Sequence, residues 1–369
     1  MSDQRLKIGI IGAGYWGPNL VRNFCTCPAT EAVAVCDANA ERLAKIGRQF
    51  QHLKLFKSVD EFLEHPLDAV AIATPVSTHF QLAKRCLEAG KHVLVEKPLT
   101  ATSEESRTLI ELAARMGKVL MVDHTYLFNP AIRKIRQIVD SGELGEIYYV
   151  DSVRINLGLF QHDINVVWDL VPHDLSIVDY VLGLEARSIS AWGCAHTDSG
   201  VEDIAYVNVD FGDRMLASFH VNWLSPVKVR QMIFAGSRKS VIFNELNATE
   251  PVKVYDRGIE LGHGDIREED RRKMLIQYRS GDCLSPFIEP AEALQGMAAH
   301  FAHCIRGGHT PVSDGLLGLR VVEMLESANR SLRSQGARIA LSGQMNHGNR
   351  NGKTEASQVR PVKFSAHRA

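Results

Sequence analysis

The sequence of 369 residues lacks the features that mark several classes of protein. No apolar run approaches the ~18 residues that a membrane-spanning helix needs, and no signal-peptide core precedes the first strand pattern. The net charge is −1, so no excess of either sign predicts a nucleic-acid or membrane partner. The seven cysteines have no regular spacing, which argues against disulfides and zinc motifs. We therefore expect a cytoplasmic globular protein without a bound metal.

The first 125 residues alternate short apolar runs with helical patterns. This alternation predicts an α/β fold with a doubly wound parallel sheet. Strands are predicted over residues 6–11, 31–36, 68–73, 91–95 and 119–122. Helices are predicted over residues 15–26, 39–49, 77–89 and 103–116, the last of them capped by Ser103.

The pattern changes after residue 126, where most segments alternate as antiparallel strands do. Strands are predicted over residues 147–155, 188–195, 204–211, 215–223, 229–235, 240–244 and 339–341. Helices are predicted over residues 129–139, 169–182, 290–306 and 315–334, and a long loop over 255–285. We thus expect a dinucleotide-binding domain over residues 1–125 and an α+β domain with a large open, mostly antiparallel sheet over 126–341. A disordered tail is expected over 342–369, where little apolar content remains.

The segment Gly12-Ala13-Gly14-Tyr15-Trp16-Gly17 leaves the first predicted strand and opens the first predicted helix. In that context the Gly-x-Gly-x-x-Gly pattern indicates a Rossmann cofactor site. The first glycine makes the tight turn, the second lets the backbone approach the pyrophosphate, and the third lets the helix pack on the sheet. We assign the backbone of the whole segment, Tyr15 and Trp16 included, to the cofactor. The alternative is a glycine turn without a ligand.

Asp37 ends the second predicted strand, 20 residues after Gly17. An acid at this place accepts hydrogen bonds from the ribose hydroxyls, and its charge repels a 2′-phosphate. The sequence therefore favours NAD over NADP, although Arg42 in the next helix weakens that preference. The alternative role for Asp37 is to cap that helix.

Three further residues bear chemistry of their own. Lys97, in Glu96-Lys97-Pro98, ends an apolar strand, and ligands of open parallel sheets bind beyond the carboxyl ends of the strands. Its positive charge favours a developing alkoxide. Asp169 and His173 are four residues apart, which places both on one face of a helix. An imidazole can take a hydroxyl proton at neutral pH, and a carboxylate one turn away can orient the substrate or hold the imidazole. The alternatives are a surface lysine, a capping aspartate and a core histidine.

Together these motifs, with Ala73-Thr74-Pro75, His79 and Asn129-Pro130, resemble the glucose–fructose oxidoreductase, inositol dehydrogenase and rhizopine catabolism family (Gfo/Idh/MocA). The resemblance implies that Lys97, Asp169 and His173 are the catalytic residues. It implies that Thr74, Pro75 and His79 line the nicotinamide side of the cofactor site, and we add Glu96 and Lys97 to the cofactor set. It also implies a homodimer or homotetramer formed through the open sheet.

The stretch Arg154-Ile155-Asn156-Leu157-Gly158-Leu159-Phe160-Gln161 resembles a subgroup that acts at C3 of nucleotide-linked sugars, such as uronates or amino sugars, in surface-polysaccharide biosynthesis. We assign Tyr126, Asn156 and Arg279 to the substrate beside the three catalytic residues. Arg279 pairs with a diphosphate or uronate in this hypothesis, since guanidinium binds such anions bidentately; a solvated loop arginine is the alternative. An inositol or other polyol dehydrogenase and a non-catalytic NAD-binding regulator remain as alternative functions.

Overall fold

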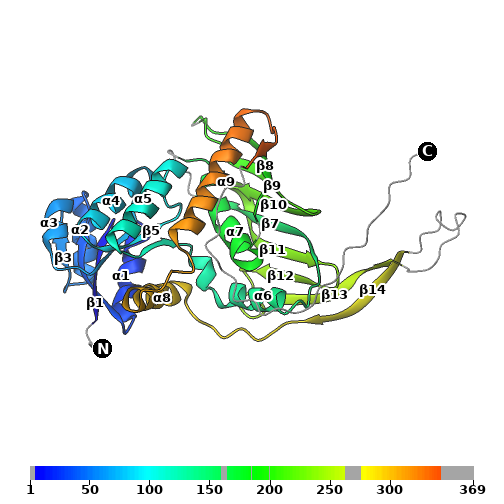
Figure 1. Ribbon diagram of the computed structural model, residues 1–369, viewed down its shortest axis with the longest axis horizontal. Coiled ribbons are helices and arrows are strands. Elements are labelled where there is room, and N and C mark those ends of the chain that lie inside the picture. Colours follow the sequence, from blue (N-terminus) through cyan, green and yellow to red (C-terminus); the bar gives the residue numbers. More distant parts are fainter. Residues whose placement is uncertain (1–4, 159–163, 184, 199, 262–275, 342–369) are drawn as a thin grey trace, which may run out of the picture.

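The computed structural model describes residues 5–158, 164–183, 185–198, 200–261 and 276–341, and places them in two sheets with helices between and around them (Figure 1). The first sheet has the order β3-β2-β1-β4-β5-β6, and every neighbouring pair is parallel. Its strands are β1 (Leu6–Ile11), β2 (Thr30–Cys36), β3 (Lys54–Phe56), β4 (Ala69–Ile72), β5 (His92–Glu96) and β6 (Leu120–Asp123). The predicted doubly wound parallel sheet is confirmed.

Five helices alternate with these strands. They are α1 (Gly17–Thr26), α2 (Ala40–Gln49), α3 (Val59–Glu64), α4 (Val76–Glu88) and α5 (Ser103–Met116). β3 and α3 were not predicted from the sequence. The three residues of β3 have largely exposed side chains and carry no apolar alternation. The cap of α5 was also wrong by one residue: the hydroxyl of Thr102, not of Ser103, accepts from the backbone N–H of Glu105.

Among the described residues, the second sheet has nine strands in the order β14-β13-β12-β11-β7-β10-β9-β8-β15, and only the β7–β10 pair is parallel. The predicted mostly antiparallel sheet is confirmed. Its strands are β7 (Ile147–Leu157), β8 (Ser188–Cys194), β9 (Ile204–Gly212), β10 (Met215–Asn222), β11 (Leu224–Gly236), β12 (Ser240–Asn244), β13 (Val252–Leu261), β14 (Ile276–Leu284) and β15 (Ile339–Ala340).

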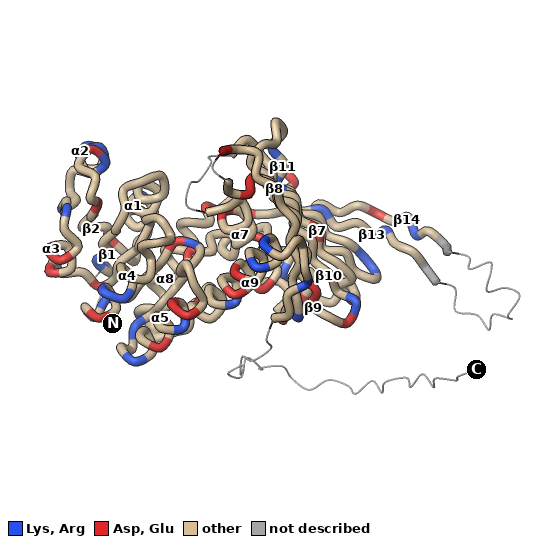
Figure 2. Tube along the Cα trace, turned by 90° about the horizontal axis from the view of Figure 1, so that it is seen from above, with Lys and Arg blue, Asp and Glu red and all other residues tan. Residues whose placement is uncertain are grey.

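The prediction of a long loop over 255–285 is wrong for the part that the structure describes. β13 and β14 pair as antiparallel strands that extend away from the rest of the molecule (Figures 1 and 2). Ile259 and Tyr278 are exposed on them, so neither strand shows the one-sided apolar alternation that betrays a buried strand. The predicted disordered tail over 342–369 lies outside the described residues.

The remaining helices follow β6 along the chain. They are η1 (Thr125–Phe128), α6 (Pro130–Asp140), α7 (Val166–Leu182), α8 (Ala293–Gly307) and α9 (Gly315–Arg333). α6, α7 and α9 cover the face of the second sheet that looks toward the first, and the opposite face carries no helix of the described chain (Figures 1 and 2). α8 packs beside α1, where Phe24 meets Phe301 and Arg22 pairs with Glu292 at 2.5 Å.

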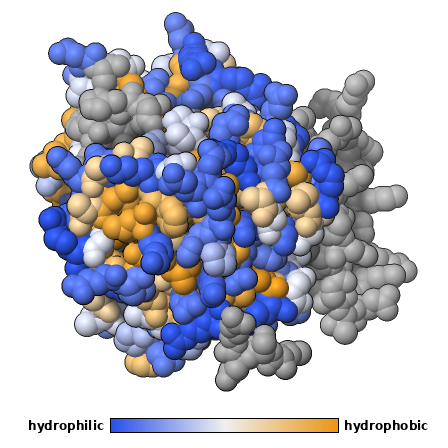
Figure 3. Space-filling model, turned by 90° about the vertical axis from the view of Figure 1, so that its left-hand side faces the viewer, coloured by the Kyte–Doolittle hydropathy of each residue, from blue (hydrophilic) through white to orange (hydrophobic). Residues whose placement is uncertain are grey.

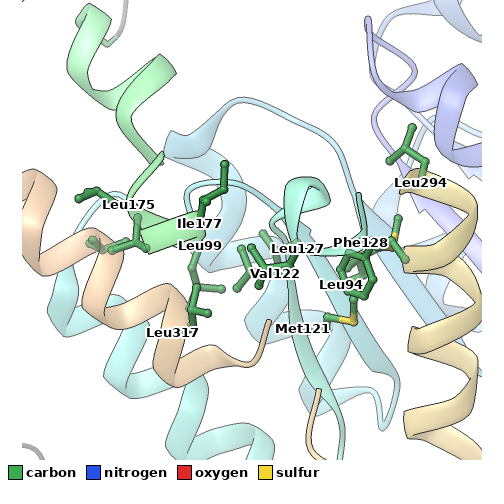
Figure 4. Close-up of a cluster of buried hydrophobic side chains, with 14 of the residues drawn as sticks. Leu94, Leu99, Met121, Val122, Leu127, Phe128, Leu175, Ile177, Leu294 and Leu317 are labelled. Carbon is green, nitrogen blue, oxygen red and sulfur yellow. The ribbon is translucent and has the colours of Figure 1, made fainter. Parts of the chain in front are cut away.

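Buried apolar side chains from both halves of the chain meet where the sheets are joined (Figure 4). Leu94 and Met121 of the first sheet lie in one cluster with Leu175 of α7, Leu294 of α8 and Leu317 of α9. α9 contacts β6 and α5 of the first half and α7 of the second, so this close packing resists relative movement of the two sheets. This junction fixes the relative position of Lys97, which follows β5, and Asp169 of α7.

The surface at the far end of the first half is mostly hydrophilic with smaller apolar patches (Figure 3). Within the described ranges, no helix is long and apolar enough to cross a membrane. The same part of the chain contains no group of three His, Cys, Asp or Glu side chains placed to hold a metal ion.

Candidate active site

The glycine segment between β1 and α1 fits a dinucleotide. Gly12 has φ +102°, and a Cβ there would lie 2.4 Å from the carbonyl oxygen of Ala73. A Cβ on Gly17 would lie 2.2 Å from the carbonyl oxygen of Gly12. A Cβ on Gly14 would have Nη1 of Arg42 as its nearest neighbour, at 3.9 Å, which leaves open space for the pyrophosphate of a dinucleotide. Two glycines are thus needed by the fold, and the third leaves room for a ligand.

Asp37 lies directly beside this segment. Its carboxylate accepts from the backbone N–H of Ala13 at 2.6 Å and from that of Asn39 at 2.7 Å. Asn39, not Asp37, caps α2, because its side chain accepts from the N–H groups of Glu41 and Arg42. Asp37 is therefore not the cap of α2. Tyr15 and Trp16 are largely exposed beside the turn, with their rings edge to face at 5.3 Å.

The segment after β4 carries Thr74, Pro75 and His79. Thr74 and Pro75 stand at the carboxyl end of the sheet, where α4 begins. His79 is only 1% exposed, and its ring nitrogens lie 2.8 Å from the carbonyl oxygen of Thr74 and 2.9 Å from that of Pro98. Burial lowers its pKa. The structure gives His79 the role of a brace between two loops, in place of the direct cofactor contact that the resemblance implied.

Lys97 and Asp169 meet across the junction of the two halves. Nζ of Lys97 donates to the carbonyl oxygen of Asp169 at 2.7 Å and to Oδ1 of the same residue at 3.2 Å. Nε1 of Trp223 donates to Oδ2 of Asp169 at 3.1 Å. Both carboxylate oxygens are therefore engaged, and the ammonium group is fixed at the edge of the first sheet.

His173 follows Asp169 by one turn of α7, a helix whose N-cap is the side chain of Asn165. Its ring meets the ring of Tyr126 edge to face at 5.1 Å. No hydrogen bond joins it to Asp169 among the described residues, so the carboxylate holds Lys97 rather than the imidazole. Burial lowers the pKa of His173 well below 6.5, and the charges of Lys97 and Arg154 add to this effect. Because its pKa is lowered, the neutral form of the imidazole persists to lower pH than in an exposed histidine.

Glu96 precedes Lys97 in the chain and is the partner of Asp123 in the register of β5 and β6. Burial raises the pKa of Asp123 to about 6. Burial and the nearby Asp123 raise the pKa of Glu96 well above 4.5. Since Glu96 is 8% exposed and Asp123 1%, this pair supports the strand ends from within. The prediction of Glu96 as a cofactor ligand is replaced by this supporting role, because its carboxyl group is turned to Asp123.

The structure brings one of the two remaining predicted substrate residues to this site. Asn156 follows Arg154 by two positions on β7, which puts both side chains on the sheet face that α7 covers. Its Oδ1 is buried and has no hydrogen-bond partner among the described residues. Arg279 lies on β14, pairs with Asp256 at 2.9 Å and donates to the carbonyl oxygen of Arg238. Arg238 follows the end of β11 opposite to Trp223, so Arg279 is remote from Asp169 within one chain.

Several residues near Lys97, Asp169 and His173 were not predicted as site residues. Arg154 and Asp174 form a buried ion pair at 2.6 Å, which gives Asp174 a structural role. Trp223, His124, Arg230 and Glu245 also surround the site. Arg154 was detectable as a charged residue at an inward position of a strand. The others carry no local signal, because their positions depend on strand register.

A cavity of about 440 Å³ opens between the two halves of the chain beside Trp168. Ser77 and Ala101 line it from the first half, and Asn165, Glu202 and Arg333 line it from the second. The first half contributes the start of α4, directly after Thr74 and Pro75. The space next to the predicted nicotinamide segment is thus walled by both halves.

Family models match both halves of the chain. Residues 6–124 match a model described as an oxidoreductase family with an NAD-binding Rossmann fold, and residues 132–242 match the GFO/IDH/MocA C-terminal domain. The UDP-N-acetylglucosamine 3-dehydrogenase of Acidithiobacillus ferrooxidans is 31% identical over 86% of this chain and 94% of its own. Its solved structure covers 90% of this chain and 98% of that chain with a TM-score of 0.74 and 27% identity.

Two further proteins are similar to this chain. The scyllo-inositol 2-dehydrogenase (NAD⁺) of Bacillus subtilis is 26% identical over 90% of this chain and 95% of its own. The dehydrogenase from Bordetella pertussis solved with NADH and UDP-GlcNAcA shares the fold, with a TM-score of 0.75 at 19% identity over 93% of this chain and 100% of that chain. The family model for residues 6–124 agrees with the Rossmann cofactor site predicted from the glycine segment. The chain belongs to the Gfo/Idh/MocA family of oxidoreductases and is an NAD-binding dehydrogenase of sugar or polyol CH–OH groups.

Proposed function

We propose that this enzyme oxidises the C3 hydroxyl of a nucleotide-linked sugar, or reduces the corresponding ketone. The observation that carries the chemistry is the contact of Lys97 with Asp169, one helical turn before His173, whose pKa is lowered by burial. The substrate class rests on the relative from Acidithiobacillus ferrooxidans, a UDP-N-acetylglucosamine 3-dehydrogenase with 31% identity over nearly its full length. A role in surface-polysaccharide biosynthesis accords with that substrate class.

Each member of the trio has a distinct task in this proposal. The neutral imidazole of His173 takes the hydroxyl proton as general base. The ammonium group of Lys97 stabilises the negative charge that develops on the same oxygen. Asp169, held by Trp223, fixes Lys97 in place. NAD⁺, when bound at the glycine segment, accepts the hydride. In reduction His173 returns the proton.

A substrate panel tests the proposal. Purified enzyme with NAD⁺ is offered UDP-N-acetylglucosamine, free N-acetylglucosamine and free inositols, and NADH formation is followed. We expect the highest kcat/KM with the nucleotide sugar. An enzyme that oxidises free inositol more efficiently contradicts the proposal and supports a polyol dehydrogenase, the activity of the relative from Bacillus subtilis.

We further propose that the uncovered face of the second sheet associates with a second copy of the chain. Tyr149, Trp192, Tyr206 and Leu216 are 42–60% exposed on strands of this face. Large exposed apolar areas on one sheet face are typical of protein interfaces. Sedimentation of the wild type and of Tyr206→Asp tests this: we expect a dimer or tetramer that dissociates in the variant. A monomeric wild type contradicts it.

A further inference from the structure

Two arginines stand side by side next to the catalytic histidine. Arg154 of β7 and Arg230 of β11 are direct partners in the antiparallel register. Like charges directly opposite on neighbouring strands destabilise a sheet unless other groups compensate them. The compensation differs between the two, and this difference points to a function.

Arg154 is fully committed to the fold. Its Nη2 donates to Oδ1 of Asp174 at 2.6 Å and its Nε to the same oxygen at 3.1 Å. Its Nη1 donates to the hydroxyl oxygen of Tyr126 at 2.8 Å. The side chains of Arg154 and Asp174 are 4% and 1% exposed. All three nitrogens of this guanidinium group thus donate within the fold, so none is available to a ligand.

Arg230 is held more loosely and is more accessible. Its Nη1 lies 3.3 Å from the hydroxyl oxygen of Tyr126 and 3.4 Å from Oε1 of Glu245. Its Nε has no partner in the described part of the chain. Arg230 and Glu245 are 24% and 27% exposed. The guanidinium group of Arg230, a donor, and the carboxylate of Glu245, an acceptor, thus lie together and are partly exposed.

This pair belongs to the substrate side of the site. The hydroxyl of Tyr126 donates to Oε2 of Glu245 at 2.7 Å, and the ring of Tyr126 meets that of His173. Arg154 and Arg230 both approach the hydroxyl oxygen of this tyrosine, at 2.8 Å and 3.3 Å, which places their guanidinium groups beside the ring that His173 contacts. A sugar whose hydroxyl reaches His173 therefore has its neighbouring substituents beside Arg230 and Glu245.

We propose that Arg230 and Glu245 form a subsite that binds the sugar ring next to the reacting carbon and selects a neutral ring over a uronate. Arg154 pairs with Asp174 and Arg230 pairs with Glu245, so each of the two arginines has a carboxylate partner. A neutral ring offers hydroxyl or acetamido groups that accept from Arg230 and donate to Glu245. A ring carboxylate placed beside Glu245 would meet a like charge, and like charges brought together disfavour a ligand. This inference rests on the proposed function and specifies its substrate.

Two substrates that differ at one carbon test it. UDP-N-acetylglucosamine carries a neutral C6 hydroxymethyl group, and UDP-N-acetylglucosaminuronic acid carries a carboxylate there. With NAD⁺, we expect the wild type to prefer the neutral sugar by at least about tenfold in kcat/KM. Glu245→Gln leaves the Arg230 charge uncompensated, so the ratio should move toward the acid by about tenfold. Glu250→Gln, at an exposed carboxylate paired with Lys253 in the same turn region, is the matched control and should keep the wild-type ratio.

The outcomes separate this inference from the function on which it rests. A wild type that prefers the uronate, or a Glu245→Gln ratio equal to that of the control, overturns the subsite alone. Turnover of free polyols with neither nucleotide sugar oxidised overturns the proposed function and the subsite with it. If Glu245→Gln fails to fold, the wild-type ratio of kcat/KM values still tests the subsite, because a preference for the uronate overturns it.

Discussion

The indole of Trp223 donates a hydrogen bond to Oδ2 of Asp169 across 3.1 Å, while Lys97 donates to Oδ1 of the same carboxylate across 3.2 Å. Trp223 is 1% exposed, so its indole is fixed by packing. The second sheet, through this tryptophan, thus sets the position of a lysine that belongs to the first sheet. Trp223 is a positioning residue for the proposed chemistry.

Replacing Trp223 by Phe should lower kcat by about tenfold, since a hydrogen bond to a charged group contributes about 1.5–3 kcal/mol and only part of it acts on the rate. NAD⁺ affinity should stay within about twofold, because the glycine segment is untouched. Steady-state kinetics and NAD⁺ titration measure both quantities. Trp192→Phe, on the uncovered sheet face, is the matched control. Equal kcat values for the two variants would show that Asp169 does not depend on the indole.

Replacing His173 by Ala should lower the rate of oxidation by about 10²–10⁴-fold with NAD⁺ binding retained, because the general base is lost. The wild-type pH profile carries a second sign of this role. Burial lowers the pKa of His173, so the neutral form persists as pH falls and the acid limb of the oxidation rate should lie below pH 6.5. His52→Ala at an exposed site serves as the control. An acid limb at or above 6.5, or a variant with wild-type turnover, contradicts the assignment.

Stability should respond to pH through His124. Its side chain is fully buried, both ring nitrogens lack a partner among the described residues, and burial lowers its pKa to about 3. Between that value and 6.5 the unfolded chain binds a proton that the folded chain excludes, so stability falls as pH falls. His124→Phe removes this effect and the unpaired polar atoms.

The gain in free energy of unfolding from His124→Phe should therefore grow as pH is lowered from about 7 to about 5, by up to ~1.4 kcal/mol per pH unit. Urea denaturation at several pH values measures it. His52→Phe, at an exposed histidine, should give a difference that does not change with pH. A constant or shrinking gain for His124→Phe would mean that the buried imidazole is protonated in the folded protein.

Features with a local cause could be predicted from the sequence. Gly12 and Gly17 are required by backbone contacts within one turn, and the spacing of Asp169 and His173 follows from helix geometry alone. The alternation of strands and helices before residue 125 also has a local origin. These features needed no knowledge of which strands pair.

Features that depend on tertiary pairing could not be predicted. The contact of Arg230 with Tyr126 arises from the register between β7 and β11, which no periodicity reveals. His79 and Glu96 stand at family motif positions, yet burial turns both toward the protein interior. Arg279 appeared suited to an anion because its strand pairing with β13 was not anticipated.

Single-turnover NADH formation by the Lys97→Met variant tests the central claim most directly. Wild type and variant, each loaded with NAD⁺, are mixed with excess UDP-N-acetylglucosamine, and NADH fluorescence is recorded. The account predicts a rate about 10²–10³-fold lower in the variant, with NAD⁺ affinity within about twofold of the wild type, since Lys97 stabilises the developing alkoxide. A variant that forms NADH at the wild-type rate would contradict the account.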